Sequence, residues 1–171
     1  LGKHCDELRE ETGVVLGLHG KTELSLLVNQ RLYADCLRHE LSDARGSQGI
    51  LLDALMERIH RIRPSGPYTL PGLMPNVAAG RVGTLLDLMG PLVVLDAGGE
   101  SLFEALSTAE QMLRHGSCRV VLAGALNAVT EPEIEPSGEL PVSEGALVLA
   151  VMRPQLAEEL GLDVLALLRV E

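Results

Sequence analysis

The residues best suited to chemistry lie in one short turn, Asp96-Ala97-Gly98-Gly99-Glu100, between an apolar run and an amphipathic segment. A glycine pair that joins a strand to a helix can hold a phosphate group at the positive N-terminus of the helix. Dinucleotide sites need the spacing G-x-G-x-x-G, and nucleoside triphosphate loops need a lysine after their last glycine. Neither pattern is present, and Glu100 places a negative charge where the anion would bind. The turn therefore does not predict a phosphate site.

Ser101 suggests a second chemistry for the same turn. The run Gly99–Phe103 begins like a nucleophile elbow, the sharp strand-to-helix turn that exposes a catalytic serine. That motif needs glycine at its fifth position so that the helix can pack closely, and this chain has Phe103 there. No base for the serine can be identified, so ester hydrolysis is a distant alternative. We expect Ser101 to be an ordinary residue of a first helical turn.

Histidine and cysteine are the other candidates for metal or nucleophilic chemistry. No pair of histidines has metal-ligand spacing, so we expect no metal and no cofactor. The five histidines are His4, His19, His39, His60 and His115. The three cysteines are Cys5, Cys36 and Cys118. Their odd number and the lack of C-x-x-C spacing indicate reduced thiols and a cytoplasmic protein rather than a disulfide scaffold.

The charge balance narrows the classes of partner. Fourteen Lys and Arg against 24 Asp and Glu give a net charge of -10, which disfavours nucleic acid and anionic membranes. The longest apolar stretch, Ala146–Met152, is far shorter than the ~18 residues of a membrane span. Arg58, Arg61 and Arg63 form the main basic cluster. These arginines either compensate the dipole at a helix end or contact an acidic partner.

The elements that must position these residues alternate between strands and helices. Short apolar runs bounded by turn residues predict five strands: Val14–Leu18, Leu92–Leu95, Arg119–Ala123, Ala146–Met152 and Val164–Leu168. Residues 64–75 contain four prolines and are expected to form a loop inside the domain. With 171 residues there is room for one domain. The fold class is α/β, a mostly parallel sheet of about five strands with helices on its faces.

Four helices are expected between these strands. Apolar residues recur at helical spacing from Leu24 to Cys36 and from Leu52 to Ile59, and two further helices run over Glu100–His115 and from Pro154 to Gly161. In the third of these, one stripe is apolar: Leu102, Ala105, Leu106, Ala109 and Leu113. A second stripe is polar: Glu100, Glu104, Ser107 and Gln111. We expect the polar stripe to face solvent or a polar partner, with Phe103 and Glu104 as possible partner contacts.

Several longer motifs resemble those of a known family. They are Met74–Val82 (MPNVAAGRV), Leu86–Pro91 (LDLMGP), Val94–Ala97 (VLDA), Cys118–Asn127 (CRVVLAGALN) and Ser143–Leu149 (SEGALVL). Together they closely resemble the β-ketoacyl synthases of polyketide and fatty-acid assembly lines. The similarity is greatest to the iterative type I enzymes that make polyunsaturated fatty acids and enediynes.

The resemblance implies half of a thiolase-like fold, in which two similar βαβαβαββ halves stack their sheets around buried helices. Residues 1–171 would then be a single truncated ketosynthase-like domain, the N-terminal half, excised from a longer acyltransferase-type synthase. In the family the turn reads Asp-Thr-Ala-Cys-Ser-Ser, and its cysteine accepts the acyl group. The aligned residue here is Gly99, which has no side chain to acylate. The family's two catalytic histidines belong to the C-terminal half, and a short acidic link between Asn127 and Ser143 replaces a longer segment.

We therefore expect a catalytically inactive structural and interaction module of a megasynthase, not an enzyme. The resemblance implies a homodimer in which Leu92, Val93, Val94 and Leu95 pair with the same strand of a second copy. One alternative is a half-domain completed by another segment, forming a pseudo-ketosynthase that binds or decarboxylates acyl groups. Another is a docking platform for acyl carrier protein, which Arg58, Arg61 and Arg63 would contact.

Overall fold

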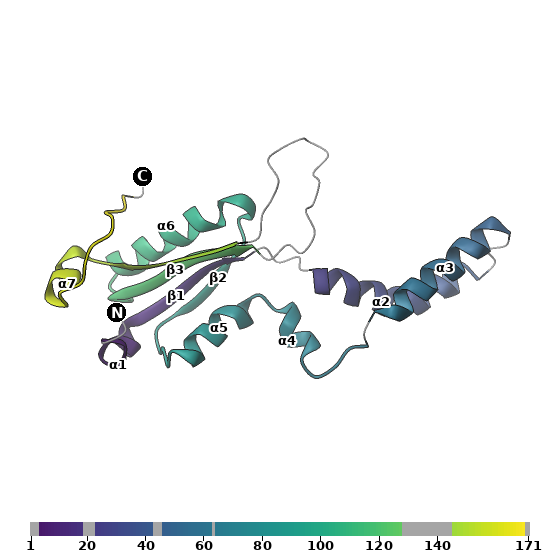
Figure 1. Ribbon diagram of the computed structural model, residues 1–171, viewed down its shortest axis with the longest axis horizontal. Coiled ribbons are helices and arrows are strands. Elements are labelled where there is room, and N and C mark those ends of the chain that lie inside the picture. The colour runs from purple at the N-terminus through teal and green to yellow at the C-terminus, as the bar shows by residue number, and fades with distance from the viewer. Residues whose placement is uncertain (1–3, 19–22, 43–45, 63, 128–144, 170–171) are drawn as a thin grey trace. The chain divides into compact units, whose positions relative to one another are not determined.

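The computed structural model describes residues 4–18, 23–42, 46–62, 64–127 and 145–169 (Figure 1). They divide into two compact units, which we describe separately. The first unit comprises residues 1–20 and 74–171 and contains the sheet, and the second comprises residues 21–73 and is helical. Among the described residues, no helix has both the length and the hydrophobicity needed to cross a bilayer.

Four strands form one mixed, mostly parallel sheet in the first unit. They are β1 (Thr12–Leu18), β2 (Leu92–Leu95), β3 (Val120–Asn127) and β4 (Gly145–Met152). The strand order is β2-β1-β3-β4, with β1 parallel to both of its neighbours and β4 antiparallel to β3. Because β1 lies in the interior of the sheet, its residues from Thr12 to Gly17 are all buried. The predicted mixed α/β class is confirmed.

The predicted fifth strand, Val164–Leu168, is wrong. The segment has no regular secondary structure, and Leu165 and Leu167 are 95% and 80% exposed. An apolar run shows only which side chains favour burial. A strand also needs a neighbouring strand whose backbone forms hydrogen bonds with it. No strand in the described part of the chain pairs with this segment.

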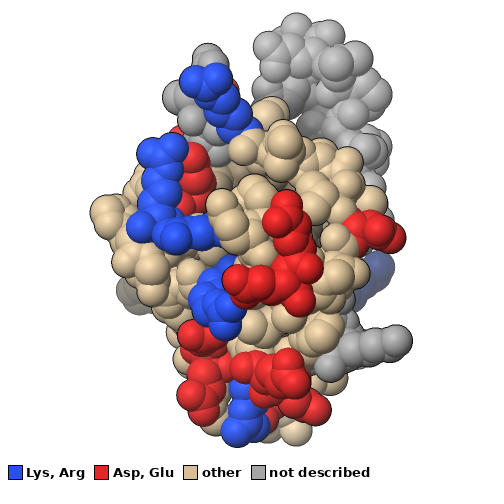
Figure 2. Space-filling view, turned by 90° about the vertical axis from the view of Figure 1, so that its left-hand side faces the viewer, with Lys and Arg blue, Asp and Glu red and all other residues tan. Residues whose placement is uncertain are grey.

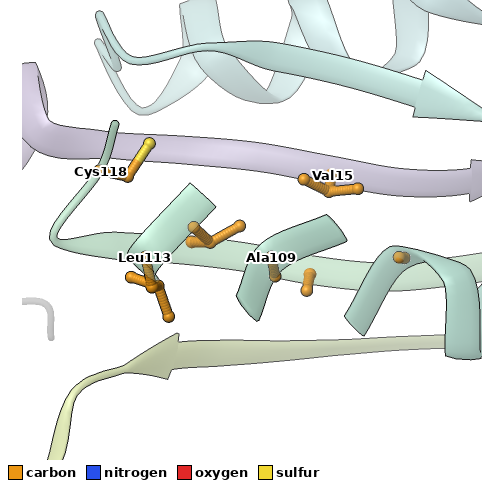
Figure 3. Packing of buried hydrophobic residues seen from close by; sticks show 7 residues of the cluster. Val15, Ala109, Leu113 and Cys118 are labelled. Atoms are coloured by element: carbon orange, nitrogen blue, oxygen red, sulfur yellow. The ribbon is translucent and has the colours of Figure 1, made fainter. Parts of the chain in front are cut away.

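Two helices cover opposite faces of the sheet (Figure 1). Helix α6 (Ser101–Arg114) packs on the face to which Val15 points, and its Ala105, Ala109 and Leu113 are buried there with Val121. Figure 3 shows this cluster and Cys118 at one end of it. The burial of Ala105, Ala109 and Leu113 confirms the predicted apolar stripe of this helix. Glu100, Glu104 and Gln111 of the predicted polar stripe are exposed.

Helix α5 (Asn76–Leu85) covers the other face and was not predicted as a helix. Its sequence, NVAAGRVGTL, contains two glycines, which are poor helix formers in isolation. Ala79 is 1% exposed and packs against Val14 and Leu16. A Cβ added to Gly83 would lie 2.9 Å from Leu92 Cδ1. The small residues therefore let α5 approach the sheet closely, and this packing outweighs the weak helix propensity.

Short elements close one end of the sheet. Helix α1 (Cys5–Leu8), a 3-10 turn (Arg9–Glu11) and helix α7 (Pro154–Glu159) lie there. Leu8 and Leu156 pack against Val120. Helix α7 confirms the prediction of a short helix that starts at Pro154.

Acidic and basic side chains alternate over this end of the molecule (Figure 2). Arg9 Nη1 lies 2.7 Å from Asp87 Oδ2, and Arg119 Nη1 lies 3.2 Å from Glu11 Oε2. Each pair is partly or largely exposed, so each contributes only about 0–1 kcal/mol to stability. Arg153 Nη2 donates to the Leu113 carbonyl at 2.6 Å and so caps the last turn of α6.

Strand β3 does not end at Gly124, as the sequence suggested, but continues to Asn127. A Cβ at Gly124 would collide with the Leu147 carbonyl oxygen of β4. This glycine therefore allows close pairing of two strands instead of ending one.

The second unit consists of α2 (Glu23–Glu40), α3 (Ser47–Arg61) and α4 (Thr69–Leu73). Helices α2 and α3 pack side by side around Ala34, Met56 and Ile59. Both long helices form where the apolar spacing predicted them, but the predicted stripe of α2 is not buried throughout, because Leu32 is 67% exposed and Cys36 is exposed. Helix α4 lies inside the predicted loop of residues 64–75, which corrects that prediction. Pro71 is compatible with it because a proline in the first helical turn removes no intrahelical hydrogen bond.

Candidate functional site

The turn between β2 and α6 lies where β2 ends at the edge of the sheet. Gly98 has φ +58°, a conformation that favours glycine. Its N–H donates to Asp96 Oδ1 at 3.1 Å, and the Glu100 N–H donates to the Ala97 carbonyl at 3.2 Å. Residues Gly98–Glu100 thus form a single 3-10 turn that leads into α6.

Ser101 holds this turn together. Its hydroxyl donates to the Gly98 carbonyl at 2.7 Å and accepts from the Ala97 N–H at 3.0 Å. The residue is only 6% exposed. A hydroxyl that is buried and bonded on both sides is a structural group, as expected for a first-turn residue, and is a poor nucleophile.

The position of the turn depends on a close contact between β1 and α6. A Cβ added to Gly17 would lie 2.6 Å from Ser101 Cβ and 2.7 Å from the Ser101 carbonyl oxygen. These distances are too short for any side chain. Only glycine at the end of β1 therefore lets the first turn of α6 rest directly on the sheet.

Gly99 lies at an open point of the turn. It is exposed, its φ is outside the left-handed region, and no atom lies within 4 Å of an added Cβ. The backbone therefore has room for a side chain at this position but carries none. The neighbouring Glu100 is exposed as well.

Cys118 cannot take the place of a nucleophile at this turn. It is 5% exposed and packs with Leu113, near the opposite end of α6 (Figure 3). Burial raises the pKa of its thiol, an effect that a hydrogen bond with the Gly13 backbone opposes. The thiol therefore stays protonated at neutral pH. Within the described ranges, no three His, Cys, Asp or Glu side chains gather as a metal site would require.

Strand β2, which the sequence analysis assigned to a dimer interface, lies at the edge of the sheet. Its one neighbour in the described sheet is β1, so its other side is open. Leu92 is 43% exposed, while Val93, Val94 and Leu95 are half-buried against α5 and α6. We call the open side of this strand the β2 edge.

The predicted partner-contact residues fall in both units. Phe103 and Glu104 are exposed on α6, and Phe103 is 70% exposed. Arg58 and Arg61 are exposed near the end of α3, where Arg61 pairs with Glu57 at 2.6 Å. Arg63 lies outside the described residues, as does the link between Asn127 and Ser143.

Comparison with known proteins points to one family. The family model described as β-ketoacyl synthase, N-terminal domain, matches residues 4–135. The chain is 32% identical over 101 residues to the spectinabilin polyketide synthase system protein NorA of Streptomyces orinoci. That match covers 56% of this chain and 5% of NorA. It is 32% identical over 123 residues to mycoketide-CoA synthase of Mycobacterium tuberculosis, covering 60% of this chain and 3% of that protein.

Solved structures show the same architecture. The ishigamide ketosynthase/chain length factor superposes with a TM-score of 0.57 at 21% identity, covering 87% of this chain and 37% of that one. The ketosynthase from module 6 of the bacillaene synthase of Bacillus subtilis 168 gives 0.55 at 20% identity, with 91% and 21% covered. Identities this low establish the fold alone. The chain spans a small part of each of these relatives.

Proposed function

The chain belongs to the β-ketoacyl synthase family, and on this premise we propose that it is a catalytically inactive, dimer-forming module of a polyketide synthase. Its fold is the N-terminal half of the thiolase-like ketosynthase fold. The observation that carries the proposal is Gly99, which lacks a side chain at the position that the family resemblance aligns with the acyl-accepting cysteine. The relatives are polyketide synthases, so we place the chain among other domains of such an assembly in the cytoplasm.

The physical argument for inactivity rests on the absence of an acceptor at this turn. Acyl transfer to the protein needs a thiolate or an activated hydroxyl that attacks the thioester carbonyl. Gly99 offers neither, and both hydrogen-bonding directions of the Ser101 hydroxyl are occupied within the turn. The exposed carboxylate of Glu100 would also oppose a thiolate beside it.

We expect the protein to gain no mass when incubated with acetyl or malonyl thioesters. Intact-protein mass spectrometry after incubation at neutral pH is the measurement. Exposed Cys36 can react slowly with any thioester, so the Cys36→Ser variant is the control. A stable adduct that survives this change and disappears when Cys118 is replaced would refute the proposal, because it would identify another nucleophile.

Dimer formation is the second part of the proposal, and the orientation of β2 supports it. The Val14 N–H donates to the Pro91 carbonyl at 2.9 Å, so the backbone of residue 91 faces β1. Successive residues of a strand direct their backbone groups to opposite sides. Val93 and Leu95 therefore face β1, whereas Leu92 and Val94 present N–H and C=O groups to the β2 edge. An apolar edge with unpaired backbone groups favours pairing with a second copy around a twofold axis.

Val94→Pro is expected to convert the dimer into a folded monomer. Proline removes an N–H that faces the β2 edge and leaves the hydrogen bonds to β1 in place. Sedimentation velocity at micromolar concentration measures the oligomeric state, and circular dichroism checks the fold. Val93→Pro is the matched control, because it removes an N–H that faces β1 and should destabilise the sheet itself. A wild-type monomer, or a Val94→Pro dimer, would contradict this arrangement.

A half-domain completed by another segment is the second candidate, and one observation favours it. Leu147 and Val148 on β4 and Leu165 beyond α7 are exposed apolar residues that a complementary segment could cover. The exposed Glu100 and Glu104 on α6 support the stand-alone module instead, because an apolar second layer over unpaired carboxylates would cost several kcal/mol. Carrier-protein docking at Arg58 and Arg61 is a further possibility that is compatible with either form.

A further inference from the structure

The β2 edge offers few ways for a second copy to pair with it. Within β2, Leu92 and Val94 direct backbone groups to this edge, because the Val14 N–H binds the Pro91 carbonyl and the two sides alternate along a strand. In an antiparallel pair related by a twofold axis, outward residues must face outward residues. The axis therefore passes through residue 92, 93 or 94.

The residues around β2 favour an axis at Val93. In that register Leu92 and Val94 of each copy form hydrogen-bonded pairs with each other, and every new bond lies within β2. An axis at Leu92 would instead set Val94 against Gly90, which lies in a bend before the strand. An axis at Val94 would set the apolar Leu92 against the exposed Asp96, and covering a carboxylate with an apolar side chain is costly.

An axis at Val93 brings the start of one β2 beside the candidate turn of the other copy. Residues equally far from the axis lie opposite each other, so Met89 comes beside Ala97 of the second copy, two residues before its Gly99. In one chain Met89 and Ala97 flank β2 at opposite ends, and eight extended residues span about 26 Å. Each turn is therefore near Met89 of the second copy and far from its own.

Met89 has the exposure expected of a residue that a second copy covers. It is apolar and 60% exposed, and its N–H donates to the Arg9 carbonyl at 2.9 Å, which fixes the backbone at this point. Leu86 and Leu92, on either side of it in sequence, are each 43% exposed. The exposed apolar surface thus continues from the β2 edge into the segment before the strand. This continuity selects a second copy as the partner.

We propose that the candidate turn is a composite site, in which Met89 of a second copy lies beside Gly99. This inference rests on the proposed dimer and adds the register of its pairing and the residue that each copy contributes to the other. Any group attached at Gly99 then contacts two chains rather than one.

Disulfide cross-linking tests the register on the full chain. Each variant carries one new cysteine in a Cys5→Ser, Cys36→Ser background, and nonreducing electrophoresis after air oxidation detects covalent dimers. Val93→Cys should cross-link, because residues that face each other in a non-hydrogen-bonded pair have Cα atoms about 4.5 Å apart, close enough for a disulfide. Leu92→Cys and Val94→Cys are the matched controls. Cross-linking of either control in place of Val93→Cys would move the axis and overturn the proposal.

Mixed dimers test the contribution of Met89 to the turn. A Gly99→Cys chain is mixed with an excess of Met89→Lys chain, and the alkylation of the new cysteine by iodoacetamide is followed by intact-protein mass spectrometry. We expect the rate to rise about threefold, because a positive charge beside the thiol lowers its pKa and so increases its reactive thiolate fraction. Met89→Asp should lower the rate. An excess of a Met89→Lys, Val94→Pro chain, which cannot pair, is the control and should have no effect.

Sedimentation velocity separates failure of this proposal from failure of the dimer itself. A monomeric chain would overturn both. A dimer in which Val93→Cys does not cross-link would overturn the register alone. A dimer in which the Met89→Lys chain leaves the rate at Gly99→Cys unchanged would overturn the composite site and leave the dimer in place. Circular dichroism melting checks that each variant is folded.

Discussion

Gly99→Cys is expected to produce a chain that accepts an acyl group from acetyl or malonyl thioesters. The Cβ of the new side chain meets no atom within 4 Å, so the turn should keep its shape. The thiol would precede the first turn of α6, where the helix dipole favours its deprotonation. For each unit by which the pKa of the thiol falls, its thiolate fraction at neutral pH rises about tenfold. The cysteine thiolate would attack the thioester carbonyl, so that the acyl group is transferred to the cysteine sulfur and the original thiol is released.

The measurement is the rate of mass gain in a Cys36→Ser background. Gly66→Cys is the matched control, since Gly66 also has open space around an added Cβ but does not precede a helix of comparable length. Glu100→Gln should accelerate the Gly99→Cys reaction further, because it removes a negative charge beside the thiolate. Equal rates for Gly99→Cys and Gly66→Cys would show that the turn no longer favours a nucleophile.

Gly17→Ala is expected to destabilise the chain strongly, although it adds only one methyl group. The Cβ would lie 2.6 Å from Ser101 Cβ and within 2.8 Å of the Ser101 carbonyl group. Because these contacts include backbone, a side-chain rotation cannot relieve them, and α6 must move off the sheet. We expect a cost of about 3 kcal/mol, at the upper end of the usual overpacking range. That is a large share of the ~5–15 kcal/mol by which domains are stable.

Urea unfolding followed by circular dichroism measures this effect. Gly99→Ala is the matched control, because it adds the same methyl group in the turn before α6, where an added Cβ has no neighbour within 4 Å. Both substitutions reduce the conformational entropy of the unfolded chain equally. The difference between their free energies of unfolding therefore measures the effect of the contact with α6. If the two variants have similar free energies of unfolding, then α6 does not rest on Gly17 as described.

The sequence predicted strands correctly where an apolar run also pairs with a neighbouring strand. Continuous apolar residues indicated β1, β2 and β4, and all three form strands. The same pattern failed at Val164–Leu168, because pairing depends on a neighbouring backbone that the pattern does not describe. Helix α5 was missed for the opposite reason. Its two glycines weaken the local helix signal. The small size of Ala79 and Gly83 matters only once β1 and Leu92 are in place.

The candidate site, like the sheet, could be predicted from the sequence only in part. The motif around Asp96–Ala97 was sufficient to locate the turn. The alignment of Gly99 with the nucleophile of the family stays a prediction from the resemblance. The double hydrogen bond of Ser101 and the close approach of Gly17 were not predictable from spacing. Both join residues that meet only when β1 and α6 are packed together. A glycine within the branched apolar run of β1 was the one local signal of that contact.

The interior position of β1 also determines when the sheet can form during synthesis. Val14 pairs with Leu92, and Thr12 pairs with Val120, so both partners of β1 are made long after it. At roughly 5–20 residues per second, a ribosome needs on the order of 5–20 s to make about 100 residues. Throughout that interval Val14, Val15 and Leu16 have no strand to cover them. Helices α2 and α3 rest on local contacts and can form first, whereas the nascent β1 has no partner strand until β2 and β3 emerge.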